Sequence, residues 1–462
     1  MAERVDFVLK GQRVHTGQGF QPLAVVARGG EIVALTSLED APPARETYDA
    51  GSHPVLPGII DPHTHMRDPG HTHREDWKTG TRAGAAGGVT CVLEHPNAVP
   101  PVNSAGNFRL KREIAAAQAY IDFGLFGGVG DGTVDRMEEQ AREGAIAFKT
   151  FLWPYPDRSD EFAGIYTIDD GVLYQIFERA AALGLPACVH AESYTLVRMF
   201  SERMKRAGKY APIHHEQSRP VVAELEAVWR TMVLAREANT RLNLLHISSG
   251  SAATAAKMWR AMHGMGVTVE TCPTYLTLTA DRMGEIGPYA KINPPLRSIE
   301  EQALLWERVA DGTIDTISSD HGPHEFAAKE RGWHNIFDAP AGAPGVETSL
   351  PIMLTHVNNG RLTLERLVEL MSANVAHLYG LYGRKGVIAV GSDADLVVVD
   401  MALRRYIEPS QLHTKDPRVA RMFEGFETLG APILTVVRGR PVMRDGEIVG
   451  EPGYGMFVSP LR

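Results

Sequence analysis

The sequence predicts an α/β protein built on a (β/α)8 barrel of the TIM type, with a small β-sandwich domain formed by both chain ends. Three observations support this prediction. The middle of the chain alternates β-rich runs with helical patterns, both ends contain only strand-like segments, and 462 residues suffice for a barrel and a satellite domain. We therefore expect residues 1–56 and 386–462 to form the sandwich and residues 57–385 to form the barrel.

The two ends of the chain share one pattern. Apolar and polar residues alternate around glycine-containing turns in VDFVLKGQRVHTG and LAVVARGGEIVAL near the start. The same alternation recurs in GVIAVGSDADLVVVD (386–400) and PILTVVRGRPVMRDGEIVG (432–450). A single β domain completed by both termini, with the middle of the chain inserted into it, explains this distribution.

Eight β-rich runs follow one another in the middle of the chain, with helical patterns such as DDGVLYQIFERAAALG between them. The runs are VLPGIID (55–61), VTCVLEH (89–95), IDFGLFG (121–127), AIAFKTF (145–151), PACVHAE (186–192), LNLLHIS (242–248), VTVETCP (267–273) and DTISSDH (315–321). Eight such units predict a parallel sheet closed into a barrel, whose active site lies at the carboxyl ends of the strands.

The composition argues against several classes of function. Lys and Arg number 47 and Asp and Glu number 56, and the resulting formal charge of −9 argues against a general nucleic-acid binder. No apolar run approaches the roughly 18 residues of a membrane helix, and the N-terminus lacks the apolar core of a signal peptide. Cys91, Cys188 and Cys272 lie in apolar runs, so we expect buried free thiols in a reducing cytoplasm.

Side chains that can bind metal stand at the predicted carboxyl ends of five of the eight strands. They are Asp61, His63 and His65 on the first strand, Lys149 on the fourth, His190 on the fifth, His246 on the sixth and Asp320 on the eighth. Histidine and carboxylate suit a borderline divalent metal such as zinc. Taken singly, a histidine here could be an ordinary satisfied polar residue and an aspartate could cap a helix. Their joint occurrence on one rim favours a metal site.

Lys149 is the unusual member of this set, because a protonated ammonium repels a cation. As a ligand it would have to be chemically altered, and a carbamate formed with CO2 would supply two anionic oxygens able to bridge two metals. An ordinary lysine paired with Asp61 or Asp320 is the alternative. The residues alone leave both interpretations open.

Together these residues resemble the ligand set of the binuclear amidohydrolase superfamily, in particular its cyclic amidase branch of dihydroorotases, hydantoinases or dihydropyrimidinases, and allantoinases. The resemblance covers essentially the whole chain, including the split β domain. It implies two zinc ions bridged by a carboxylated Lys149. One ion would be held by His63, His65 and Asp320, and the other by His190 and His246.

The same resemblance assigns two further roles. Asp61 would orient a ligand histidine from outside the metal shell. Asp320 would accept a proton from the attacking water and pass it to the leaving nitrogen of a cyclic amide. Oligomers of two or four identical subunits are also typical of these enzymes.

The stretch HMRDPG resembles the dihydroorotase motif and assigns Arg67 to the carboxylate of the substrate, because a guanidinium matches a carboxylate bidentately. Asn97 in HPNAVPPV and Asn293 in KINPPLR would face the ring. His324 in SSDHGPHE would be a second carboxylate-binding group.

These four assignments have structural alternatives. Arg67 could pair with Asp68 or Asp76, the two asparagines could cap loops, and His324 could lie on the surface.

Other segments resemble hydantoinases instead. They include FKTFLWPYPDRSDEF (148–162) and HHEQSRPVVAELEAV (214–228). Tyr155 is the nearest candidate for the tyrosine with which hydantoinases bind a carbonyl, although it stands one place later than expected. The pair Glu94-His95 also replaces the apolar pair usual in dihydroorotases.

Three hypotheses follow. The first is a dihydroorotase-type hydrolase, or reverse cyclase, acting on dihydroorotate or a similar carboxylate-bearing ring, because the residues facing the substrate carry that motif. The alternative is a hydantoinase, dihydropyrimidinase or allantoinase acting on a neutral cyclic ureide. A non-catalytic scaffold is the remote third, since such relatives typically lose metal ligands and this chain retains the full set.

Overall fold

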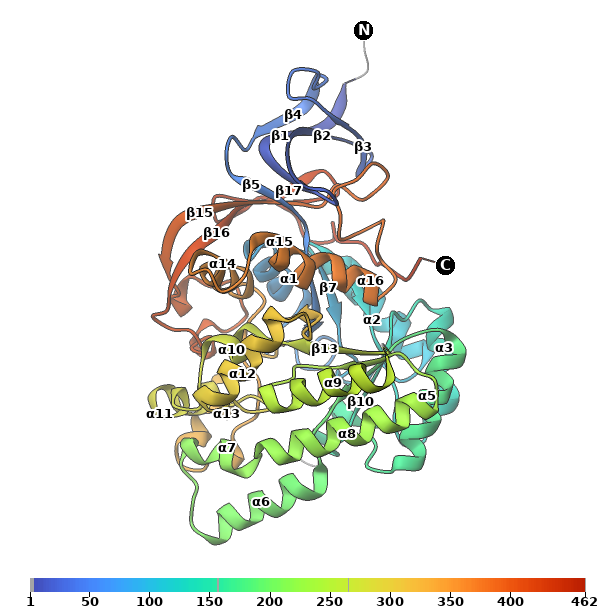
Figure 1. Cartoon of the computed structure of the whole chain (residues 1–462), viewed down its shortest axis with the longest axis vertical. Helices are drawn as coiled ribbons and strands as arrows, with labels where there is room; N and C mark the ends of the chain where they lie inside the picture. Colours follow the sequence, from blue (N-terminus) through green and yellow to red (C-terminus); the bar gives the residue numbers. More distant parts are fainter. Residues whose placement is uncertain (1–3, 156–157, 265, 462) are drawn as a thin grey trace.

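The computed structural model describes residues 4–155, 158–264 and 266–461. It confirms the predicted fold class. A parallel β/α barrel forms the lower part of the molecule in Figure 1, and a mostly antiparallel sheet built from both chain ends lies above it.

The barrel strands are short and buried, and neighbouring strands pair in parallel. They are β6 (Ile59–Thr64), β7 (Val89–Glu94), β8 (Asp122–Leu125), β9 (Gly127–Gly128), β10 (Phe148–Phe151), β11 (Ala187–His190), β12 (Leu242–Leu244), β13 (Val267–Thr271) and β14 (Thr316–Ile317). β8 and β9 flank Phe126 and act as one strand. The barrel closes beyond β14, where the backbone N–H of His65 donates to the carbonyl of His321 over 2.8 Å.

Helices follow the strands and cover the barrel. The longer ones are α1 (Trp77–Ala86), α2 (Ala105–Gln118), α5 (Asp170–Leu183), α6 (Tyr194–Arg206), α8 (Val221–Glu237), α9 (Gly250–His263), α12 (Ile299–Ala310) and α14 (Ser349–Asn358). Shorter helices are α3 (Met137–Arg142), α4 (Ser159–Phe162), α7 (His215–Ser218), α10 (Pro273–Thr277), α11 (Arg282–Ile286), α13 (Phe326–Glu330), α15 (Leu364–Val368) and α16 (Asn374–Leu378). Several begin with a side-chain cap, such as Asp76 on Thr79 N and Ser249 on Ala252 N.

The upper sheet joins the two chain ends. Its strands are β1 (Val5–Thr16), β2 (Gly19–Arg28), β3 (Glu31–Thr36), β4 (Ala44–Asp49), β5 (Pro54–Pro57), β15 (Leu396–Tyr406), β16 (Glu427–Val437), β17 (Arg440–Arg444) and β18 (Glu447–Ile448). β5 links the halves, because it pairs with β1 on one side and β15 on the other. Side chains from both halves, including Phe7, Val25, Leu396 and Leu434, share one buried core. The chain then returns to the barrel, where the backbone of Val458 binds Phe123.

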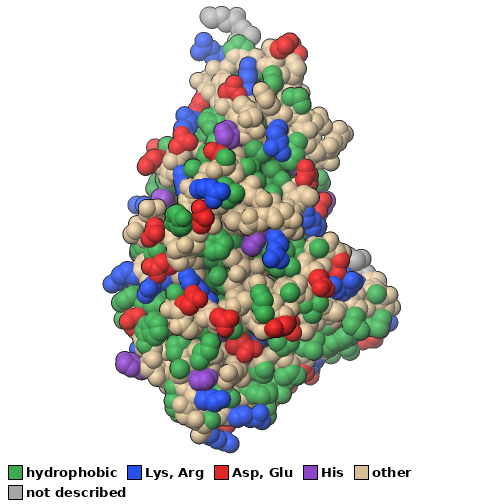
Figure 2. Space-filling model, turned by 60° about the vertical axis from the view of Figure 1, so that its left-hand side comes forward, with side chains coloured by type: hydrophobic (Ala, Val, Ile, Leu, Met, Phe, Trp, Pro, Cys, Tyr) green, Lys and Arg blue, Asp and Glu red, His purple; other side chains and the backbone are tan. Residues whose placement is uncertain are grey.

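The surface and the cysteines agree with the composition. Acidic and basic side chains are interspersed over the face seen in Figure 2. Cys91, Cys188 and Cys272 are buried free thiols, as predicted. Among the described residues, no helix is both long enough and apolar enough to cross a bilayer.

Candidate active site

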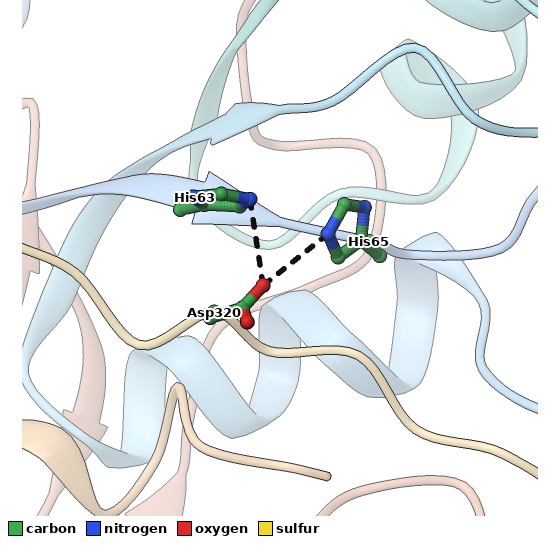
Figure 3. A group of neighbouring side chains, drawn as sticks. All are labelled: His63, His65 and Asp320. Carbon is green, nitrogen blue, oxygen red and sulfur yellow. Dashed lines mark ion pairs between the residues drawn. The ribbon is translucent and has the colours of Figure 1, made fainter. Parts of the chain in front are cut away.

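Two histidines and an aspartate converge where the first and eighth barrel strands end. Nε2 of His63 and Nε2 of His65 each lie 3.4 Å from the same Asp320 oxygen, Oδ1 (Figure 3). Donors bonded to one tetrahedral zinc lie about 3.4 Å from one another. The three side chains therefore fit a shared cation, although they come from opposite ends of the barrel sequence.

A second pair of histidines stands beside this group. His190 Nδ1 lies 3.0 Å from His246 Nε2, and both side chains are buried. His190 turns its other ring nitrogen, Nε2, toward Glu192 Oε2 at 2.8 Å. Since an ionised carboxylate only accepts, that nitrogen carries the proton, and Nδ1 presents a lone pair to its neighbour. The ring centroids of His63 and His246 are 5.1 Å apart, so the two groups lie next to each other.

Lys149 is fully buried, and its Nζ has no hydrogen-bond partner among the described residues. Burial lowers the pKa of Lys149 to about 7, although Cys188 and Asp320 oppose the shift. The lysine forms no ion pair with Asp61 or Asp320 within the described chain, so the alternative of a salt-bridged lysine finds no support. A neutral amine at this position is nucleophilic, as the formation of a carbamate requires.

Two glutamates that the sequence analysis did not assign hold the outer edges of the histidine rings. Glu270 Oε1 lies 2.8 Å from His63 Nδ1, and Glu192 holds His190. Arg219 donates to both oxygens of Glu192, at 2.9 Å from Nε and 2.5 Å from Nη2. Carboxylates in this position fix the tautomer of a metal-binding histidine. Both glutamates lie inside predicted strand runs, PACVHAE and VTVETCP. A charged residue within a buried strand was the sequence feature that could have pointed to them.

Asp61 contacts the backbone rather than a histidine ring. Its Oδ1 accepts the N–H of His63 at 3.2 Å and the N–H of Ser319 at 3.1 Å. Burial raises the pKa of Asp61 to about 6. Asp61 therefore joins the ends of β6 and β14, and the ring-orienting role predicted for it falls to Glu270.

Backbone conformation marks the same region. Seven described non-glycine residues have positive φ, and four of them are site residues: Arg67 (58°), Tyr155 (46°), His246 (39°) and Asp320 (47°). Such conformations are costly for ordinary side chains and cluster at functional sites.

A pocket opens directly over the histidines. Its lining includes four predicted substrate-binding residues, namely Arg67, Asn97, Tyr155 and Asn293. The Oδ1 atoms of Asn97 and Asn293 are buried and have no hydrogen-bond partner among the described residues, so these side chains do not cap loops through those atoms. Unpaired buried acceptors facing a pocket are available to the N–H groups of a ligand.

Arg67 pairs with neither Asp68 nor Asp76. Its Nη1 lies 3.6 Å from Glu161 Oε2 instead, in an ion pair that the sequence analysis missed. The Asp76 side chain caps α1, and the Asp68 side chain accepts from Gln118 at 3.1 Å.

His324 is buried rather than superficial, with its side chain behind Arg67. His324 Nε2 lies 3.3 Å from Arg67 Nη2 and 2.9 Å from the carbonyl oxygen of Ala341. The Tyr155 ring stacks on Phe162, with centroids 3.9 Å apart, and forms part of an aromatic wall of the pocket.

Comparisons with known proteins agree with this geometry. Residues 55–442 match the model of the amidohydrolase family. An allantoinase of Rubrobacter xylanophilus is 40% identical over 463 residues, covering 99% of this chain and 98% of that protein. An L-hydantoinase of Paenarthrobacter aurescens is 36% identical and covers 98% of each chain. The solved structure of the L-hydantoinase (dihydropyrimidinase) from Arthrobacter aurescens superposes with a TM-score of 0.93 at 36% identity, covering 98% of this chain and all of that one.

These relatives favour the alternative of a hydantoinase or allantoinase over the dihydroorotase-type prediction, which was drawn from a short motif around Arg67. The chain belongs to the amidohydrolase family and, within it, to the cyclic amidases.

Proposed function

We propose that the protein hydrolyses a neutral five-membered cyclic ureide of the hydantoin type at a binuclear metal centre. Hydantoin and allantoin share this ring, so a pocket that binds the ring would suit either of the two activities named among the relatives. The observation that carries the proposal is the convergence of four histidines, Asp320 and a partnerless buried lysine beneath a pocket lined by two unpaired amide oxygens.

We assign the ligands as the resemblance to the amidohydrolase superfamily implies. One divalent ion would be held by His63, His65 and Asp320, and the other by His190 and His246. Zinc is the first metal to test. Lys149 would bridge the two ions as a carbamate derived from CO2. Such a metal pair lowers the pKa of water and polarises the amide carbonyl.

The protein's own side chains supply the remaining steps. Asp320, at the junction of the histidines and the pocket, takes the proton of the attacking water and delivers it to the ring nitrogen that leaves. Asn97 and Asn293 accept hydrogen bonds from ring N–H groups through their Oδ1 atoms. Phe151, Tyr155 and Phe162 form an apolar wall that limits access of bulk water to the ring.

A substrate panel tests the proposal directly. The protein, supplied with zinc and bicarbonate, is assayed on hydantoin, allantoin, dihydrouracil and dihydroorotate. We expect kcat/KM for hydantoin or allantoin to exceed that for dihydroorotate by at least about tenfold, the scale of a pocket built for different polar groups. A preference for dihydroorotate would contradict the proposal and restore the first hypothesis.

The metal centre and the assembly are tested separately. We expect two metal equivalents by elemental mass spectrometry and a carbamate signal by carbon-13 NMR after labelling with bicarbonate. A metal-free, inactive preparation under these conditions would favour the scaffold hypothesis. We also propose that the protein is cytoplasmic and forms a homodimer or homotetramer. Light scattering of the purified protein would test the oligomeric state.

A further inference from the structure

Glu161, in the short helix α4 that comes after β10, is the centre of a buried charge cluster. Its side chain is only 1% exposed and is approached by four basic groups. Arg67 Nη1 lies 3.6 Å and Arg158 Nη1 3.7 Å from Oε2, whereas His71 Nε2 lies 3.1 Å from Oε1. Arg74 also pairs with Oε1. One carboxylate thus ties the loop after β6 to the loop after β10.

All three nitrogens of the Arg67 guanidinium lie near protein groups, although Nη1 makes no hydrogen bond to the described residues. Nη1 faces Glu161, Nε donates to the carbonyl of Pro323 at 3.3 Å, and Nη2 lies 3.3 Å from His324 Nε2. A planar fork binds a carboxylate strongly only when two adjacent N–H groups are free to reach it. Arg67 lines the pocket, but its charge is directed toward Glu161.

Arg158 is held in the same way. Nη1 lies 3.3 Å from His324 Nε2, and the guanidinium lies over the rings of Tyr155 and Phe162, at 4.9 and 5.0 Å from their centroids. Arg158 lines the pocket together with Arg67. Glu161 therefore sits behind both of the cations that face the substrate.

We propose that Glu161 determines substrate charge: its carboxylate offsets part of the positive charge of Arg67 and Arg158, so that the pocket favours a neutral ring over one bearing a carboxylate. This inference rests on the proposed function. A second carboxylate would have to compete with Glu161 for the same two guanidiniums in a desolvated site, where like charges are costly. The motif around Arg67 therefore does not create a dihydroorotase pocket here.

The test is Glu161→Gln, which keeps the size of the side chain and removes its charge. We expect the ratio of kcat/KM for dihydroorotate to that for hydantoin to rise at least about tenfold, the scale of one close charge pair. The change should fall mainly in KM for dihydroorotate, with metal content unchanged. Combining it with Arg67→Met should abolish the gain.

Glu325→Gln is the matched control. Glu325 lies 3.5 Å from Arg74 and 2.8 Å from His73, in the loop after β6 that also contacts Glu161. The substitution therefore removes one carboxylate close to the same loop. Among the described residues, Glu325 forms no ion pair with Arg67 or Arg158, so the substrate ratio should stay at the wild-type value.

Two outcomes would overturn the inference while leaving the proposed function intact. One is an unchanged ratio in Glu161→Gln, and the other is an equal loss on both substrates, which would make Glu161 only a loop anchor. If Glu161→Gln does not fold, the inference can still be tested on the wild-type protein with two related substrates. The wild type should hydrolyse hydantoin-5-acetic acid at least about tenfold more slowly than the corresponding amide, and equal rates would refute the inference. A wild type that hydrolyses no neutral ring would instead overturn the proposed function and this inference with it.

Discussion

Two buried lysines of this protein have opposite surroundings. Lys385, between the barrel and the upper sheet, places its Nζ 2.5 Å from Asp122, 2.6 Å from Asp395 and 2.9 Å from Asp393. Lys149, within β10, has no hydrogen-bond partner within the described chain, and its Nζ lies 4.4 Å from the centroid of the Phe151 ring.

The comparison shows that partners, rather than burial, decide what a buried lysine can do. Carboxylates raise the pKa of Lys385 well above its ordinary value, so the ammonium is permanent and serves as the cation of a three-aspartate cluster. Desolvation lowers the pKa of Lys149 to about 7, so the free amine is accessible near neutral pH. The first lysine fastens two parts of the fold together, and the second is available for chemistry.

The largest expected effect comes from Lys149→Met. Removing the bridging group should lower kcat/KM on the preferred ring by more than about 100-fold, beyond the 10- to 100-fold typical of an outer partner of a metal ligand. Bound metal should fall below two equivalents. The urea midpoint should not fall, because the lysine makes no hydrogen bond that the methionine would lose. Steady-state rates, elemental analysis and urea denaturation measure the three quantities, and retained metal with retained activity would refute the assignment.

Lys385→Met should have the converse effect. Asp122 and Asp393 would keep Arg438 and Arg384 as partners, but the buried Asp395 would lose its ion pair with Lys385, and breaking a buried pair costs about 3–5 kcal/mol. We expect a clear drop in the urea midpoint, with metal content and kcat/KM of the surviving folded protein near wild type. Arg404→Met is the control, because the exposed pair of Arg404 and Glu427 should contribute less than about 1 kcal/mol. Equal destabilisation by both variants would contradict this view of the cluster.

The difference between the two lysines also explains what the sequence could predict. The barrel and the convergence of the proposed ligand residues could be predicted because each of these residues follows an apolar stretch of a strand run, and barrel geometry brings those strand ends together. Lys149 was singled out by that position alone.

The charged partners of the site residues and of Lys385 could not be predicted from the sequence, because they depend on contacts between distant segments. Lys385 binds Asp122 across 263 residues, and Glu161 reaches Arg74 across 87. Periodicity fixes which face a residue occupies but not which charge lies opposite. The relatives do not support the dihydroorotase-type prediction, and the motif behind it could not show the surroundings of Arg67: Arg67 lies at the pocket, while its ion-pair partner Glu161 comes from another segment.

The smallest expected effect is a difference in pH dependence, measured on metal-free protein without bicarbonate. The pKa of Lys149 is about 7 when folded and ordinarily 10.5. Between those values the unfolded chain binds more protons at this site, so the contribution of Lys149 to the free energy of unfolding rises with pH. The advantage of Lys149→Met over wild type should therefore be greatest near pH 7 and shrink toward pH 10.

The pKa of Lys385 shifts in the opposite direction on folding, because in the folded protein it lies above the ordinary value. Its stabilisation is fully present below about pH 10.5 and is lost only as the pH rises through the folded pKa. The Lys385 ammonium itself should thus contribute a constant stabilisation between pH 7 and 9, whereas the advantage of Lys149→Met over wild type should shrink across this range. Urea midpoints of the three proteins across this range measure the slopes. A pH profile of Lys149→Met parallel to that of the wild type would mean that Lys149 remains charged in the folded protein, and the amine would then be unable to react with CO2 near neutral pH.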